Sequence, residues 1–230
     1  MGIRSIAGGS RSPVTRVFTS NTTYTPTAGT KWCEVEMVGA GGGSPGGSSI
    51  LTGVAYSSGG GSGAYIRVFC QGSEIDGKAI TVGTASAGND GGASSIGSVI
   101  VAPGGIKGQF YQSGTVSVGY CTSAAGATQT AAPTSSIGSI VVLVPGVGTA
   151  RSVHMSASAN AGFCMIMCSQ GGSNPIGAGG VPGSDSVLSS TSGLIGVGYG
   201  GGAGGGSCAL GGTLAAVAGQ PGLVIITEYF

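Results

Sequence analysis

Glycine constrains this chain more than any other feature, because it fills 51 of the 230 positions. That is about three times the ordinary frequency. The clearest runs are Gly39–Gly47, Gly59–Gly63 and Gly200–Gly206. Inside regular structure a glycine costs about 0.5–1 kcal/mol more than an alanine, because it loses more backbone entropy on folding. An ordered fold must therefore use these glycines for close contact between backbones; otherwise the runs are disordered.

Low charge and high hydrophobic content indicate that the chain packs. Charged residues make up 7% of the sequence, hydrophobic residues make up 40%, and the formal net charge is +1. Disordered segments show the reverse combination of low hydrophobicity and high net charge. The eight basic residues are scattered along the sequence, whereas nucleic-acid binding needs a concentrated basic patch. We therefore expect no nucleic-acid partner.

The six cysteines are expected to be reduced and buried. The N-terminus, MGIRSIAGGS, lacks the apolar core of a signal peptide. The longest apolar run, Ile140–Val144, is too short to cross a membrane. In a cytosol thiols stay reduced, and free cysteines behave as small buried hydrophobes. We expect free thiols and no membrane insertion.

Short β-strand patterns dominate the sequence. In Lys31–Val38 three apolar residues, Cys33, Val35 and Met37, alternate with Trp32, Glu34 and Glu36, which places the two sets on opposite faces of a sheet. Further strands are expected at Tyr65–Cys70, Ala79–Val82, Ser98–Ala102, Ser139–Val144, Phe163–Cys168 and Leu223–Tyr229. Helical spacing is almost absent, and parallel sheets need crossover helices. The predicted fold is all-β, with an antiparallel β-sandwich-like core and essentially no α-helix.

A short element occurs twice, as SSIGS at Ser94–Ser98 and at Ser135–Ser139. Each copy precedes a β-branched strand that ends at a Pro-Gly pair. The repeat predicts two equivalent turns that lead into equivalent strands.

The glycine runs between the strands have two forms open to them. Polyproline-II geometry has three residues per turn, a rise of about 3.1 Å and no internal hydrogen bonds. Glycine runs in this form can lie side by side and bond through N–H···O=C and Cα–H···O contacts, which would pair their buried backbone groups. The alternative is a set of mobile surface loops. The sequence leaves both forms open, and its low charge favours packed polyglycine-II helices.

Three glycine-dependent motifs imitate nucleotide or catalytic sites. Gly41–Gly46 satisfies GxGxxG, but no helix pattern follows it. Gly72–Lys78 has the GxxxxGK spacing of a phosphate loop, but Ala79 stands where Ser or Thr would bind magnesium. Ser44 lies in a GxSxG match that lacks the strand–turn–helix setting of a nucleophile elbow. We expect no cofactor.

Residues for acid–base catalysis or metal binding are sparse, with seven acids and one histidine. Glu34 and Glu36 should share one strand face, at a separation that a glycosidase could use. A solvated strand face is the simpler interpretation. Cys164 and Cys168 have no second ligand pair to complete a zinc site. We expect neither a metal site nor enzymatic activity.

Several segments, taken in order, resemble the glycine-rich distal domain of bacteriophage tail fibres. Tyr24–Gly43 resembles its opening strand and glycine run, and Gly60–Val68 resembles its next glycine–aromatic–strand element. Ser94–Gly105 is similar to its Ser-Ser…Ala-Pro-Gly-Gly element. Gly198–Gly206 and Gly219–Phe230 resemble its later glycine run and C-terminal strand. The resemblance covers most of the chain.

This resemblance implies a receptor-binding adhesin of the virion, at the tip of a tail fibre. Residues 1–18 would be an N-terminal segment attached to the rest of the fibre, and residues 19–230 the glycine-rich tip domain. The partner would be a bacterial outer-membrane protein or a surface polysaccharide, and the chain would act as a homotrimer or a monomeric cap. The alternative is a structural fibre cap, filament subunit or assembly protein without a receptor site.

Candidate receptor contacts lie in the segments with fewer glycines. Gln109–Tyr120 is rich in aromatic residues and lies outside the family-like segments. Loops of Tyr, Ser, Gly and Asn suit recognition, and a stiff scaffold loses little entropy on binding. The predicted contact residues are Tyr56, Phe110, Tyr111, Gln112, Tyr120, Arg151, His154 and Asn160.

Overall fold

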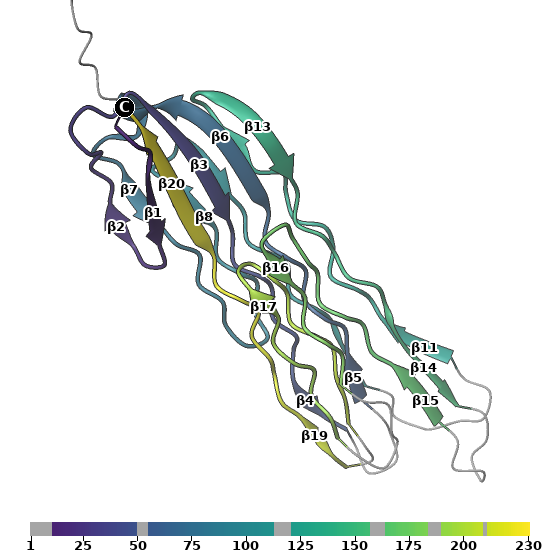
Figure 1. Cartoon of the computed structure of the whole chain (residues 1–230). Coiled ribbons are helices and arrows are strands. Elements are labelled where there is room, and N and C mark those ends of the chain that lie inside the picture. Colours follow the sequence, from purple (N-terminus) through teal and green to yellow (C-terminus); the bar gives the residue numbers. More distant parts are fainter. Residues whose placement is uncertain (1–10, 50–54, 113–120, 157–163, 184–189, 209–210) are drawn as a thin grey trace, which may run out of the picture.

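The computed structural model describes residues 11–49, 55–112, 121–156, 164–183, 190–208 and 211–230. The molecule is elongated (Figure 1). A β-sandwich forms the end that holds the C-terminus, and glycine-rich runs extend from it to the opposite end, which we call the distal end. The one helix of the described chain is α1 (Gly72–Ile75), so this part of the chain contains no helix long enough to span a membrane. The predicted all-β, antiparallel fold is confirmed.

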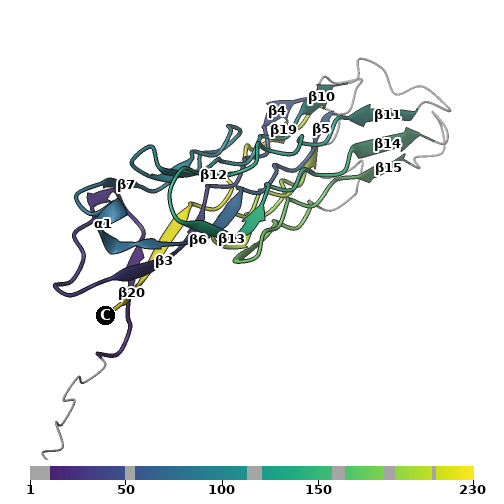
Figure 2. The ribbon, with the colours of Figure 1, turned by 90° about the horizontal axis from the view of Figure 1, so that it is seen from above.

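The sandwich consists of two five-stranded antiparallel sheets. The first sheet has the order β1 (Val14–Phe18), β20 (Leu223–Tyr229), β3 (Trp32–Val38), β6 (Tyr65–Gln71) and β13 (Ser139–Val144). The second has the order β12 (Thr134–Ser135), β9 (Ile100–Ala102), β8 (Ser94–Ile96), β7 (Ala79–Thr81) and β2 (Thr22–Thr23). Figure 2 shows the two layers, with β7 and β12 on one side and β3, β20 and β13 on the other.

The core lies between these two layers. Cys33, Val35 and Met37 of β3 are fully buried there, against β-branched residues of the second sheet that include Ile80 and Ile96. Trp32 and its alternating neighbours on β3 face outward, as the period of two predicts. Four more short sheets follow along the molecule. They are β10 (Phe110–Gln112) with β5 (Ala55–Ser57) and β18 (Ser207–Cys208), β11 (Cys121–Ala124) with β14 (Ser152–Ser156) and β15 (Cys164–Met167), β16 (Gly177–Ala178) with β17 (Val197–Gly198), and β4 (Gly47–Ser48) with β19 (Thr213–Leu214).

The glycine runs bond to one another with a period of three. In the central run, Gly59–Ala64, the amides of residues 60 to 62 donate to three different neighbouring runs, and the amide of Gly63 returns to the first of these. The acceptors are the carbonyls of Ala203, Ile106, Val147, Gly200 and Pro103, for the amides of residues 60, 61, 62, 63 and 64 in turn. Three residues per turn is the period of polyproline-II geometry.

The run that follows β3 shows the same order. Gly39 and Gly42 donate to the central run, whereas Gly41 and Ser44 donate to the run at residues 217–220. Six successive amides of this run thus find partners in three neighbouring segments, since residues 40 and 43 donate to residues 92 and 89. These described runs therefore take the packed form rather than the form of surface loops.

Close approach of the backbones explains why these positions are glycine. A Cβ atom on Gly60 would lie 2.1 Å from the carbonyl oxygen of Gly42, and one on Gly202 would lie 1.9 Å from the oxygen of Gly60. Neither distance is sterically possible, and the obstructing atoms belong to backbone that cannot rotate away. The glycines are thus required by the contact between runs.

One predicted boundary needs correction. Val14–Phe18, which the sequence analysis assigned to an N-terminal attachment segment ending at residue 18, is strand β1 and pairs with β20 along its whole length. Just before this strand, the guanidinium of Arg11 lies 4.5 Å from the ring centroid of Phe230. The described chain therefore begins and ends at the same end of the molecule, and the sandwich includes residues that precede position 19.

Candidate functional site

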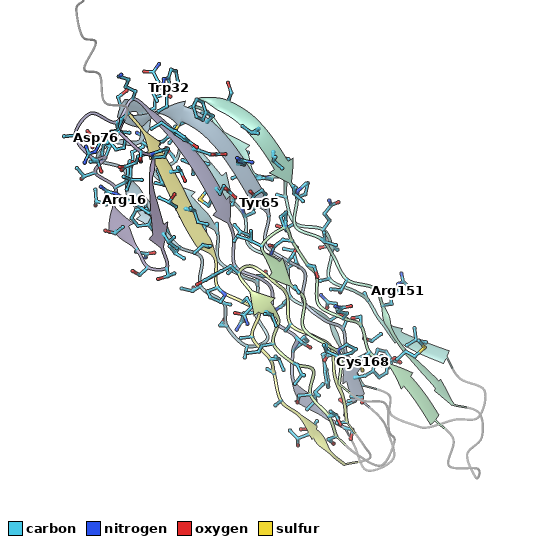
Figure 3. The ribbon with its side chains drawn as sticks, in the orientation of Figure 1. Arg16, Trp32, Tyr65, Asp76, Arg151 and Cys168 are labelled. Carbon is cyan, nitrogen blue, oxygen red and sulfur yellow. The ribbon has the colours of Figure 1, made fainter. Side chains whose placement is uncertain are left out.

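The distal end gathers most of the predicted contact residues. There β10 lies beside β11, and β14 lies beside β5, so that two three-stranded sheets adjoin (Figure 2). Six of the eight predicted contacts belong to these strands or their immediate flanks: Tyr56, Phe110, Tyr111, Gln112, Arg151 and His154. The other two, Tyr120 and Asn160, lie outside the described residues. Figure 3 shows Arg151 on the side of the bundle near this end.

Tyr56 is a packing residue, which corrects its prediction as a contact. Its side chain is fully buried, and Cys168 packs beside it. Tyr56 and Tyr111 face each other across β5 and β10, with ring centroids 5.2 Å apart. Tyr111 is half-buried by this packing. The pair fixes β10 to the body of the molecule, since tilted aromatic pairs are stabilising at this separation.

Phe110 is anchored on the opposite face of the same strand. It packs against the buried residues Ala55, Cys208 and Leu214. Gly47 provides the space, because a Cβ there would lie 2.3 Å from Cζ of the Phe110 ring. Phe110 therefore positions β10 and is itself only partly buried.

Gln112 and Arg151 are the predicted contacts that the structure places with exposed side chains. Gln112 is the last residue of β10, and Arg151 directly precedes β14. His154 lies within β14, where its backbone is paired with Thr122 and Ile166. Among the predicted contacts whose side chains the structure describes, Gln112 and Arg151 thus form the accessible, polar part of the candidate site.

A network of buried serines, which the sequence analysis missed, holds the distal strands in place. The Ser152 hydroxyl donates to the Ser57 carbonyl over 2.9 Å and accepts from the Ser169 amide over 3.0 Å. The Ser58 hydroxyl donates to the Ala125 carbonyl over 2.7 Å and accepts from the Gln109 amide over 2.8 Å. Each of these hydroxyls satisfies backbone groups where strands and glycine runs meet, which buried polar groups require. The occurrence of serines beside glycine runs was the sequence feature that could have predicted these buried hydrogen bonds.

A shallow hollow of about 480 Å³ lies beside the paired strands β16 and β17. The two polar side chains that line it, Ser173 and Asn174, already form hydrogen bonds with backbone groups. Asn174 donates to the Tyr199 carbonyl and accepts from the Ile176 amide, and Ser173 accepts from the Gly179 amide. The hollow offers little polar specificity for a small molecule.

The paired carboxylates on β3 belong to a structural cluster on the outer face of the first sheet. Glu34 forms an ion pair with Arg67 and accepts from the Tyr229 hydroxyl over 3.1 Å. Glu36 accepts from the Tyr65 hydroxyl over 2.7 Å. Burial and the hydrogen bond to Glu36 raise the pKa of Tyr65 well above its ordinary value. The two carboxylates lie on one face of the sheet as predicted, and both interact with side chains of neighbouring strands.

The described residues contain no group of three or more His, Cys, Asp or Glu side chains that could hold a metal ion. Cys33, Cys70 and Cys208 are free, buried thiols, as the sequence analysis expected. Comparison with known proteins yields no relative: no protein-family model matches the chain, and no curated protein matches it.

Proposed function

We propose that this protein is the receptor-binding adhesin at the tip of a phage tail fibre and that it contacts the host surface with its distal end. The observation that carries the proposal is that the two termini of the described chain and the candidate contacts lie at opposite ends of the molecule. Arg11 and the C-terminal Phe230 lie together at the sandwich end, whereas Gln112 and Arg151 lie toward the other end (Figures 1 and 3). Attachment through the segment before β1 would leave the distal end free to meet a cell.

The packed glycine runs support this function physically. Their amides are paired between runs, and side chains that could disturb the packing are excluded at positions such as Gly60 and Gly202. A scaffold fixed in this way loses little conformational entropy when its end binds a partner. The chain has few acidic residues, and Glu34 and Glu36 already form an ion pair or a hydrogen bond with side chains of a neighbouring strand. Both facts favour binding over catalysis.

Competition for phage adsorption tests the proposal. The purified chain, added to host cells before the phage, should reduce adsorption by occupying receptors. A Gln112→Ala, Arg151→Ala double variant removes the two exposed side chains named above and should compete less well. Lys31→Ala, an exposed change at the sandwich end, is the matched control and should compete like the unmodified protein. A native chain that has no effect on adsorption would contradict the adhesin proposal.

A second candidate function, a structural assembly element, is favoured by edge strand β13. All of its residues from Ser139 to Leu143 are exposed, although four of them are large aliphatics. Apolar edge strands without charges are normally covered by another chain or protected. This edge would suit side-by-side packing of copies in a fibre cap or filament.

Light scattering after size-exclusion chromatography separates the two candidates. An open-ended polymer would favour the assembly element, and a monomer or a trimer would favour the adhesin. If β13 mediates association, Val141→Glu should shift the protein to monomer, since a charge would then be buried at the contact. Val197→Glu, at a residue that is 75% exposed on β17, is the control and should leave the mass unchanged.

A further inference from the structure

The three central strands of the first sheet continue directly into glycine runs. β3 is followed by the run that begins at Gly39, and β6 is preceded by the central run. β20 is preceded by the run at residues 217–222, in which the Gly222 amide donates to the Gly83 carbonyl. Figure 1 shows these strands lying along the length of the molecule. Tension applied at the distal end therefore reaches the sheet through covalent backbone as well as through the hydrogen bonds between runs.

Strand β1 is an edge of the first sheet, and β20 is its one neighbour among the described strands of that sheet. The two strands are antiparallel, with Val14 opposite Glu228 and Phe18 opposite Val224. β1 starts at the end of the molecule that holds the C-terminus and runs toward the glycine runs, whereas β20 starts at the glycine runs (Figure 1). Tension between the segment before β1 and the distal end would therefore pull the two strands past each other along their length.

Side chains join β1 to its surroundings near the middle of the strand. The hydroxyl oxygens of Thr15 and Thr227 lie 3.1 Å apart across the two strands. The Arg16 guanidinium donates to the Thr25 carbonyl over 3.0 Å and to the Thr27 hydroxyl over 2.7 Å, in the segment between β2 and β3. β1 cannot slide along β20 without breaking these bonds together with the backbone bonds of the ladder.

We infer that the pairing of β1 with β20 is a mechanical clamp, which transmits tension between the segment before β1 and the distal end. The inference rests on the proposed function, in which these are the two attached ends. When the strands are pulled past each other, all bonds of the ladder carry the load together, because antiparallel ladder bonds lie perpendicular to the strands. When the strands are separated from one end, the same bonds break one after another. The clamp should therefore resist the first direction of pull and open readily in the second.

Single-molecule force spectroscopy on the whole chain tests the inference by changing only the direction of pull. In the shear geometry, one handle is attached at Met1 and the other at an azide-bearing residue in place of Thr213, which is exposed on β19 at the distal end. In the peel geometry, the handles are attached at Met1 and Phe230, so that the ladder opens at Val14 first. At equal pulling speed the first rupture should need at least about twofold more force in shear than in peel, since forced unfolding is limited by its barrier and shear loads the whole ladder. A smaller ratio would overturn the inference.

Two destabilising variants separate the clamp from overall stability. Arg16→Gln removes the side-chain bonds of β1, whereas Ile80→Ala creates a cavity at a buried residue of β7, in the other sheet. Arg16→Gln should lower the shear rupture force by at least about a third, and Ile80→Ala should lower it by less than about a tenth, because only the first change lies in the loaded contact. Equal reductions would mean that rupture follows overall stability, which would overturn the inference. Rupture force is measured without phage or cells, so a failure of adsorption competition would contradict the adhesin proposal and leave the expected forces unchanged.

Discussion

Arg16 and Glu228 join the first and last strands of the sandwich through a partly buried ion pair, with Nε of the arginine 3.3 Å from Oε1 of the glutamate. The Glu228 side chain is fully buried, whereas that of Arg16 is 36% exposed. The same oxygen accepts hydrogen bonds from the Tyr24 hydroxyl over 2.8 Å and the Thr27 amide over 3.2 Å. Oε2 finds no hydrogen-bond partner among the described residues. The buried negative charge of Glu228 is therefore stabilised by the few groups that contact one of its two oxygens.

Removing either partner should destabilise the protein by different amounts. Arg16→Gln leaves a buried carboxylate without its cation and should lower the free energy of unfolding by about 3–5 kcal/mol. Glu228→Gln removes the charge and keeps an acceptor for Tyr24, so we expect a loss of about 1–2 kcal/mol. Arg16 can then turn to solvent. Urea denaturation of both variants measures the difference, and equal losses would contradict this account.

The pH dependence of stability should follow from the same carboxylate. Burial raises the pKa of Glu228, but hydrogen bonds from Thr27 and Tyr24, together with the charge of Arg16, outweigh burial and hold the pKa below its ordinary value. A depressed pKa contributes stability above the unfolded-state pKa of about 4.3, and that contribution is lost as the pH falls through the folded-state value. The free energy of unfolding should therefore decline below about pH 4, and Glu228→Gln should show a shallower decline. A parallel decline in both proteins would exclude Glu228 as the source.

The sandwich was predictable because its signals are local. The period of two in β3 assigns Cys33, Val35 and Met37 to the core, and the structure confirms this. The threefold hydrogen bonding was not predictable, since which run accepts from the amide of Gly60 depends on segments far apart in the sequence. The sequence supplied the composition that permits such packing, and the contacts between runs decide its form.

The repeated SSIGS element and Tyr56 show two other limits of the sequence. Both copies of the element turn at a glycine with positive φ, Gly97 and Gly138. The first joins β8 to β9 within one sheet, whereas the second leads from β12 into β13 of the other sheet. Tyr56 was predicted as a contact from its residue type, but cross-strand packing against Tyr111 buries it. Local pattern identifies turns and aromatic residues, and tertiary packing decides their role.

The thiols of Cys33 and Cys70 should be unreactive in the folded protein. They are register partners on β3 and β6, and both are fully buried. Burial, with a smaller contribution from the neighbouring Cys33, raises the pKa of Cys70 to about 12. Because the thiolate is the reactive form, iodoacetamide should label neither residue at pH 8 until the chain unfolds. Peptide mass spectrometry in buffer and in guanidinium chloride measures this, and rapid labelling in buffer would contradict the packing of the sandwich.

Alanine substitution of two neighbouring glycines in one run should distinguish the effect of packing between runs on stability from the effect of intrinsic backbone preference. Gly60 and Gly61 are consecutive residues of the central run, so alanine should have nearly the same intrinsic effect at both. Only the tertiary contact differs: a Cβ on Gly60 would lie 2.1 Å from the Gly42 oxygen, whereas one on Gly61 would lie 3.0 Å from the nearest atom, the Val147 oxygen. Gly60→Ala must push two backbones apart and break the bonds between runs, and we expect it to lower the free energy of unfolding by at least about 3 kcal/mol. Gly61→Ala requires a shift of a few tenths of an ångström and should cost about 1 kcal/mol or less. Equal melting temperatures for the two variants would mean that the runs do not pack as described, and the rigid scaffold that supports the proposed function would be lost with them.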